Sequence, residues 1–269
     1  LSYMYLNYNS NDTFVSTGGK NIELNKPTIC FVHGAGQNHF SFTQQIRYFA
    51  NRGYNVLSPD FPGHGFSKGI PNSSIEEDAK WLLGVLEKIG IKKFVVGGHS
   101  QGCLTALELS QLKPEVLKGI IFMAGASKIP VNDFLIGKAS EDPYKAYDLM
   151  VTWGHGNQGS FSISEWPGHH HLSEGNSVMK INEMSALVND LNSCNNYEGG
   201  LSAAEKINID CLAVLARFDI MTPLKAGKKL VNAIKNCESH VLNCGHFLPA
   251  EKPKELNRII LQYLKNLDE

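Results

Sequence analysis

The 269-residue sequence has almost no net charge, −1 with histidine neutral, so electrostatics favours neither nucleic acid nor an anionic membrane as a partner. It lacks an apolar run long enough for a transmembrane helix, and its start has neither the basic residues nor the apolar stretch of a signal peptide. Its six cysteines include no C-x-x-C pair, which favours a reduced, cytoplasmic setting, although Cys237 and Cys244 could pair. With 42% hydrophobic residues, the chain can bury the core of one large α/β domain.

Apolar runs typical of buried strands alternate with segments of helical spacing. An antiparallel β meander, punctuated by Gly18 and Gly19, is expected first, over residues 3–9 and 13–24. The later strands are nearly uninterrupted apolar runs, which belong in a parallel sheet with helices on both faces. These runs are residues 28–32, 55–58, 93–96, 118–123, 211–216 and 239–243.

The alternation is interrupted over residues 127–208, where no apolar strand run appears. The apolar residues there have helical spacing, and the best helices are residues 142–153 and 177–191. We therefore expect residues 1–126 and 209–269 to form one α/β core, with 127–208 inserted as a helical lid. Two ordinary βα crossovers with long loops are the alternative, and the long absence of strand signal argues against it.

The stretch GGHSQG contains the pattern G-x-S-x-G between the strand at 93–96 and a segment of helical composition. In that context the pattern predicts a nucleophile elbow, a tight turn that strains the backbone of Ser100 and directs its hydroxyl into a cleft. Such a turn leaves no room for side chains at Gly98 and Gly102. A glycine-rich loop with an incidental serine is the weaker alternative, because it does not explain the flanking strand and helix.

A serine nucleophile needs a base and an orienting acid. His246 follows the last strand, on a loop before the final helix, and is the expected base. Asp219 lies just past the end of a strand, where open parallel sheets place their chemistry, and is the expected acid. Thr222 and Pro223 are expected to supply an N-cap and a first-turn proline to the next helix. The order Ser100, Asp219, His246 is the one that this architecture requires.

Other histidines and aspartates are weaker candidates, because they lie in backbone-shaping motifs, after an earlier strand, in the predicted lid or at the wrong end of a strand. They are His33, His99, His155, His169, His170, His171, Asp60, Asp190 and Asp210. Three adjacent histidines cannot all face one metal from a regular element, so the sequence predicts no metal site.

The negative charge that develops on an attacked carbonyl oxygen needs preorganised N–H donors. The residue after the nucleophile, Gln101, is one expected donor. The other is expected from the turn after the strand at 28–32, where Gly34 and Gly36 let the backbone approach closely, and Ala35 is the chosen residue. A plain tight turn would need the same glycines and remains the alternative.

Taken together, five motifs make the chain resemble the α/β-hydrolase superfamily over nearly its whole length, and most closely its lidded bacterial esterase-like members. They are HGAG at 33–36, DFPGHGFS at 60–67, GHSQG at 98–102, DIMTP at 219–223 and GHFLPAEKP at 245–253. The chain departs from the common pattern at Asp210, where proline is frequent, and at Ala216, where glycine is. Ser100 in place of an aspartate argues against the dehalogenase and epoxide-hydrolase branches.

The resemblance implies an α/β-hydrolase fold and hydrolysis of a small-molecule carboxylic ester through an acyl-serine, without cofactor or metal, by a monomer or homodimer. Activity should fall in acid as His246 takes up a proton. Gly34, Phe134, Trp153 and Trp166 are expected to contact an apolar substrate. Simple packing of the lid on the core explains those aromatic residues equally well.

Other functions remain open on the same fold. The triad also serves hydrolysis of a C–C bond in a diketone, and cleavage of lactones or thioesters. Outside catalysis, a protein of this superfamily can bind a small ligand and signal through its lid, hydrolysing slowly or not at all.

Overall fold

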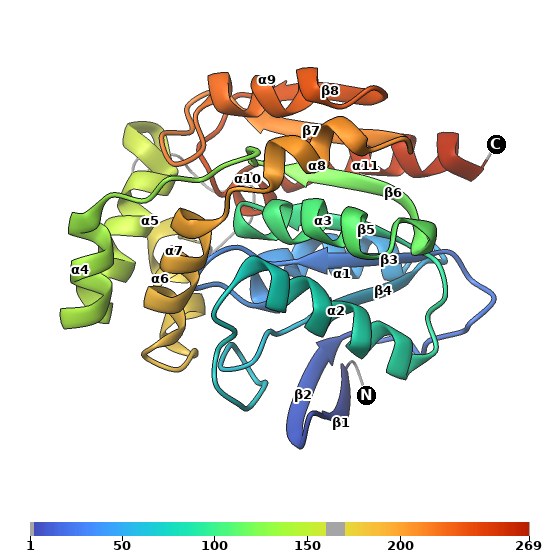
Figure 1. Ribbon diagram of the computed structural model, residues 1–269, viewed down its shortest axis with the longest axis horizontal. Coiled ribbons are helices and arrows are strands. Elements are labelled where there is room, and N and C mark those ends of the chain that lie inside the picture. Colours follow the sequence, from blue (N-terminus) through green and yellow to red (C-terminus); the bar gives the residue numbers. More distant parts are fainter. Residues whose placement is uncertain (1–2, 160–169, 269) are drawn as a thin grey trace.

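The computed structural model describes residues 3–159 and 170–268. Its centre is an eight-stranded sheet in the order β1-β2-β4-β3-β5-β6-β7-β8 (Figure 1). The strands are β1 (Tyr3–Tyr8), β2 (Asn11–Ser16), β3 (Thr28–Val32), β4 (Asn55–Pro59), β5 (Phe94–His99), β6 (Leu117–Met123), β7 (Cys211–Ala216) and β8 (Cys237–Leu242).

Strands β3 to β8 run parallel to one another, whereas β2 pairs antiparallel with both β1 and β4. The predicted parallel sheet is therefore confirmed, but the N-terminal meander is reduced to the antiparallel pair β1 and β2, because β2 ends at Ser16 and the described residues 17–24 form no strand. Asn9 and Ser10, both with positive φ, form the two-residue turn between β1 and β2. Such turns match the twist of the strands that they join.

Helices cover both faces of the sheet. The α-helices are α1 (Thr43–Ala50), α2 (Ile75–Ile89), α3 (Gln101–Leu112), α4 (Asp133–Glu141), α5 (Pro143–Gly159), α6 (His171–Lys180), α7 (Ala186–Asn196), α8 (Gly200–Lys206), α9 (Leu224–Ala233), α10 (Leu248–Glu251) and α11 (Pro253–Asp268). Two 3₁₀ helices, η1 (His39–Phe42) and η2 (Pro114–Val116), complete the described structure.

The core consists of two apolar layers, one on each face of the sheet. Successive residues of a strand face opposite sides, so Phe122 of β6 packs with α2, α3 and α9 while its neighbour Met123 packs with α1 and α11. Because both faces are covered, β3, β4, β5 and β7 are buried at every position. Most of their residues are therefore apolar, with exceptions such as Asn55 and Ser58 of β4.

Helices α4 to α8 lie between β6 and β7 in the chain, and we call them the β6–β7 helices. Helices α4 to α7 gather at one end of the sheet, at the left of Figure 1, over a third apolar cluster that includes Tyr147 and Leu187. Helix α8 packs instead against α3 and α9. No helix in the described part of the chain has both the length and the apolar character needed to cross a membrane.

The prediction of one helix over residues 177–191 was wrong. The structure has the end of α6 and the beginning of α7 there, separated by residues 181–185. Asn182 in this break is buried and bonds to the backbone of an adjacent loop, an interaction that helical spacing does not reveal. The possible pairing of Cys237 with Cys244 is also not found, because both thiols are free.

Candidate active site

Ser100 lies in the sharp turn between β5 and α3. Its φ of 53° and ψ of −116° place it in a sparsely populated backbone region for a residue with a side chain. A Cβ at Gly98 would collide with the backbone of Gly102, and a Cβ at Gly102 would collide with the carbonyl of Val32. The steric reason given for both glycines is therefore confirmed, and the turn has the form of a nucleophile elbow.

Asp219 and His246 are brought together from two different loops. Asp219 follows β7 and His246 follows β8, and both strands end at the same edge of the sheet as β5. The Nδ1 atom of His246 lies 2.8 Å from Oδ2 of Asp219, and the two residues are only 1% and 5% exposed. Burial alone would raise the pKa of the Asp219 carboxyl, but the adjacent imidazole and hydrogen bonds from His246 and Thr222 lower it.

Thr222 has a different part from the one predicted. It does not cap α9, whose N-cap is Pro223. Instead, its hydroxyl lies 2.7 Å from the carbonyl oxygen of Ala124 and 2.8 Å from Oδ2 of Asp219. The other oxygen of Asp219 accepts hydrogen bonds from the backbone N–H groups of Met221 and Thr222, each at 2.8 Å. The loop therefore fixes the carboxylate at both oxygens.

The loop that carries His246 is fixed by contacts from both sides. The backbone N–H of His246 donates to the carbonyl oxygen of Gly154 in α5 at 2.7 Å. The carbonyl oxygen of His246 lies 2.8 Å from Nε2 of His99, the residue before Ser100, and the two imidazole rings are 4.9 Å apart. Burial, followed by the charge of His246, lowers the pKa of His99 to about 3. His99 is therefore a neutral structural contact between the elbow and the His246 loop.

The turn after β3 approaches the elbow closely. A Cβ at Gly34 would lie 3.0 Å from Cβ of Ser100, so a side chain there would press on the serine. Ala35 and Ser100 line the same cavity. Gln101 begins α3, directly after the serine. Of the two residues expected to donate N–H groups, Ala35 thus shares a cavity with Ser100 and Gln101 follows it in the chain.

A cavity of about 320 Å³ opens in front of Ser100. Its walls are mainly apolar, and none of its lining residues in the described part of the chain is charged. They are Ala35, Ser100, Ile129, Pro130, Val131, Asn132, Leu135, Met150, Trp153, Leu191, Cys194, Ile220 and Met221. Most of these side chains come from the segment between β6 and β7, so that segment determines the shape of the cavity.

The aromatic residues expected at the substrate have different positions. Trp153 of α5 lines the cavity. Phe134 of α4 is 58% exposed and is not among the lining residues, whereas its neighbour Leu135 is. Because adjacent helical residues point about 100° apart, only one of the pair can face the cavity. Trp166 lies outside the described residues.

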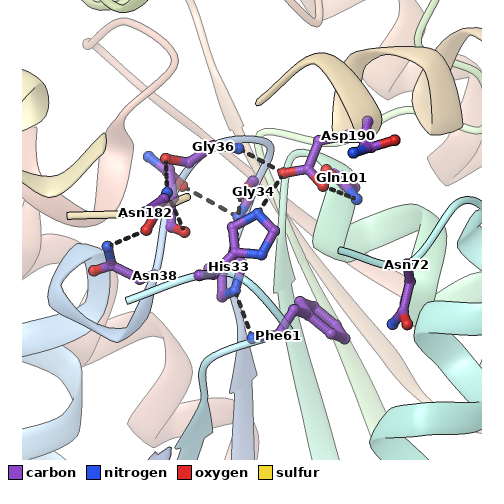
Figure 2. A network of polar contacts seen from close by, with 12 residues as sticks. His33, Gly34, Gly36, Asn38, Phe61, Asn72, Gln101, Asn182 and Asp190 are labelled. Carbon is purple, nitrogen blue, oxygen red and sulfur yellow. Dashed lines mark hydrogen bonds and ion pairs between the residues drawn. The ribbon is translucent and has the colours of Figure 1, made fainter. Parts of the chain in front are cut away.

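A buried polar network that the sequence did not reveal lies beside the elbow (Figure 2). Its centre is Asp190 of α7, whose Oδ2 accepts the backbone N–H of Gly36 at 2.7 Å and lies 2.9 Å from Nε2 of His64. Burial alone would lower the pKa of His64, but the Asp190 charge raises it to about 9. No signal in the sequence links residues so far apart. In the described residues, no group of His, Cys, Asp and Glu side chains is arranged to hold a metal ion.

The fold and this site define an α/β hydrolase, and comparison with known proteins agrees. The family model for the alpha/beta hydrolase fold matches residues 27–253, so the chain belongs to that family. The solved structure of the enol-lactonase from Burkholderia xenovorans LB400 superposes with a TM-score of 0.88 at 18% identity, covering 97% of this chain and 100% of that one. This likeness establishes the fold.

Two curated relatives are similar over most of the chain. The 2-hydroxy-6-oxononadienedioate/2-hydroxy-6-oxononatrienedioate hydrolase 1 of Pseudomonas putida is 26% identical, over 89% of this chain and 88% of that protein. The bifunctional epoxide hydrolase 2 of Sus scrofa is 25% identical, over 89% of this chain and 51% of that protein. Both relatives are named as hydrolases, and their names differ in the substrate.

Proposed function

We propose that this chain is a serine hydrolase that cleaves a neutral carboxylic ester through an acyl-serine on Ser100. The observation that carries the proposal is the buried 2.8 Å contact between His246 and Asp219, on a loop that bonds to His99, the residue before a strained serine that lines an apolar cavity. A serine at the elbow also argues against epoxide hydrolysis, the activity named for the pig relative.

In the proposed mechanism, His246 takes the hydroxyl proton of Ser100 as its oxygen attacks the ester carbonyl. Asp219 holds the imidazole through Nδ1, which leaves Nε2 as the proton acceptor, and balances the positive charge that forms. The backbone N–H groups of Ala35 and Gln101 bind the oxyanion, and each donor of this kind is worth about 3 kcal/mol of barrier. His246 then protonates the leaving alcohol and activates the water that releases the acid.

The cavity indicates the class of substrate. Its volume of about 320 Å³ is near the lower end of the range for small-molecule sites, roughly 300–1,000 Å³. Asn132 and Ser100 supply polar side-chain atoms to an otherwise apolar wall. An apolar wall favours a neutral acyl or alcohol group, because a buried carboxylate without a partner is costly. In this proposal the β6–β7 helices serve as the lid that encloses that group.

Hydrolysis of a C–C bond is the second candidate, and the name of the Pseudomonas putida relative supports it. That relative is named for a dioate, which carries two carboxylates. The cavity lining in the described part of the chain has no lysine or arginine to bind either carboxylate. The apolar lining therefore favours an ester, or a C–C substrate with a neutral end.

A panel of p-nitrophenyl esters tests the proposal. The acetate, butyrate and octanoate report neutral acyl groups of increasing size, and the hemisuccinate is the charged counterpart of the butyrate. We expect rapid turnover of butyrate, at least tenfold slower turnover of hemisuccinate, and loss of both in Ser100→Ala. A vinylogous 1,5-diketone cleaved faster than any ester would assign the C–C reaction instead. Covalent labelling of Ser100 by a fluorophosphonate without ester turnover would favour a ligand receptor.

A further inference from the structure

Asp190 reaches from the β6–β7 helices into the turn that carries one of the proposed oxyanion donors. Its Oδ2 accepts the N–H of Gly36 at 2.7 Å, and this N–H belongs to the peptide group that also contains the carbonyl of Ala35 (Figure 2). The same carboxylate makes a long contact, 3.5 Å from Oδ1, with the side-chain Nε2 of Gln101. One carboxylate therefore contacts both segments that flank the nucleophile.

Asn182 holds the other side of the same peptide segment. Its Nδ2 donates to the carbonyl oxygen of Gly36 at 2.7 Å, while its Oδ1 accepts the N–H of Gly65 at 2.7 Å. Gly36 has a φ of +65°, and Leu187 of α7 lies where a side chain would project. Asp190 of α7 therefore binds the N–H of Gly36, and Asn182, in the connection between α6 and α7, binds its carbonyl oxygen.

Asp190 and its polar neighbours are buried, and they include ionisable side chains that a simple packing contact does not require. Asp190 is only 4% exposed, and its partner His64 lies 2.9 Å away with 2% exposure. Asp78 is a second buried carboxylate, and it accepts from Gln101 Nε2 at 3.0 Å. Burying a carboxylate carries a desolvation penalty, which its hydrogen bonds to the turn offset.

We propose that Asp190 is a positioning residue for the oxyanion hole: by holding the Ala35–Gly36 peptide it fixes the backbone of Ala35, so that the Ala35 N–H faces the oxygen of the carbonyl group attacked by Ser100. The proposal rests on the proposed ester hydrolysis. If Asp190 has this role, catalysis depends on how α7, which carries Asp190, packs against the core. A displaced donor acts mainly on the transition state, so the loss should appear in kcat rather than in KM.

The test compares Asp190→Ala, Asp190→Asn and the control Tyr197→Phe in the full chain. Tyr197, directly after α7, donates to Glu108 of α3 at 3.1 Å, so its variant removes a hydrogen bond between the β6–β7 segment and the core away from the oxyanion turn. With p-nitrophenyl butyrate we expect Asp190→Ala to lower kcat about 10–100-fold with KM within about threefold. Asp190→Asn keeps an acceptor for Gly36 and should recover most of kcat, and Tyr197→Phe should stay within about twofold.

Amide hydrogen exchange of Gly36 provides a readout that does not depend on turnover. Exchange should accelerate in Asp190→Ala and remain slow in Tyr197→Phe. If Asp190→Ala does not fold, the double variant Asp190→Ala/His64→Asn also removes the His64 imidazolium that would be left without its carboxylate partner. It tests the same hydrogen bond between Gly36 and residue 190. Unchanged kcat in the folded variant, or a kcat loss that merely follows the folded fraction, overturns the proposal.

The two proposals fail in different ways. If the wild-type chain does not turn over esters, the proposed function fails, whether or not a fluorophosphonate labels Ser100. Gly36 exchange then still decides whether Asp190 holds the turn. If the wild-type chain is active and Asp190→Ala is equally active, only the positioning claim fails.

Discussion

Replacing Thr222 by valine tests how the acid is held. Valine keeps the shape of threonine but removes a hydroxyl that lies 2.7 Å from the carbonyl of Ala124 and 2.8 Å from Asp219. The single hydroxyl proton serves these two acceptors, so its loss leaves one buried acceptor without a donor. That costs about 1–3 kcal/mol of folding free energy, or roughly 2–6 °C in Tm for a chain of this size.

Activity should fall much less than it would if the acid itself were replaced. In Thr222→Val, Asp219 keeps two backbone N–H donors and the contact with His246. We therefore expect kcat to drop about 3–10-fold, against about 10⁴-fold for Asp219→Asn. Thr222→Ser should restore both Tm and kcat. A kcat loss in Thr222→Val as large as in Asp219→Asn would refute the reasoning, and so would an unchanged Tm.

Three further predictions concern pH, the cavity and the turn. Burial is the largest cause that lowers the pKa of His99 to about 3 and of His33 to about 4, so the unfolded chain takes up protons below pH 6.5 that the folded chain refuses. The two histidines therefore lose about 3 kcal/mol of folding free energy per pH unit as pH falls from 6 to 4. Asp78 offsets about half of this loss, because burial, followed by the charge of Asp190, raises its pKa to about 7. Melting curves by circular dichroism should thus show Tm falling with acid, and a flat or rising Tm would contradict this. Trp153→Ala enlarges the cavity and should raise the octanoate-to-butyrate ratio of kcat/KM at least threefold, a shift that the ester panel measures. Gly34→Val should press on Ser100 and lower kcat of the folded protein at least tenfold, and wild-type kcat in that variant would show that the turn has more room.

The sequence predicts the sheet and the elbow well because both depend on local signals. Apolar runs marked the central strands, and the glycines around Ser100 are required by contacts within a few residues of the elbow and with β3. The loops carrying Asp219 and His246 follow strands, and parallel strands deliver their ends to one edge. Their meeting could therefore be inferred from chain order.

The remaining features depend on partners far away in the chain, which periodicity does not identify. Helical spacing placed Asp190 in the predicted lid but gave no sign of its contact with Gly36. The same spacing extended one helix across residues 181–185, where Asn182 turns to a distant backbone carbonyl. Thr222 was expected to cap a helix, whereas its hydroxyl hydrogen-bonds to the carboxylate of Asp219 and to the carbonyl oxygen of Ala124, which follows β6. In each case a hydrogen bond to a residue distant in the chain fixes the side chain, and local spacing does not predict it.

Mass spectrometry of the fluorophosphonate-treated protein tests the central claim most directly. The account predicts one phosphonyl adduct per chain, located on Ser100, absent in Ser100→Ala and formed at least 100-fold more slowly in His246→Gln. An adduct on another residue, or equal labelling rates in the wild type and His246→Gln, would contradict the account.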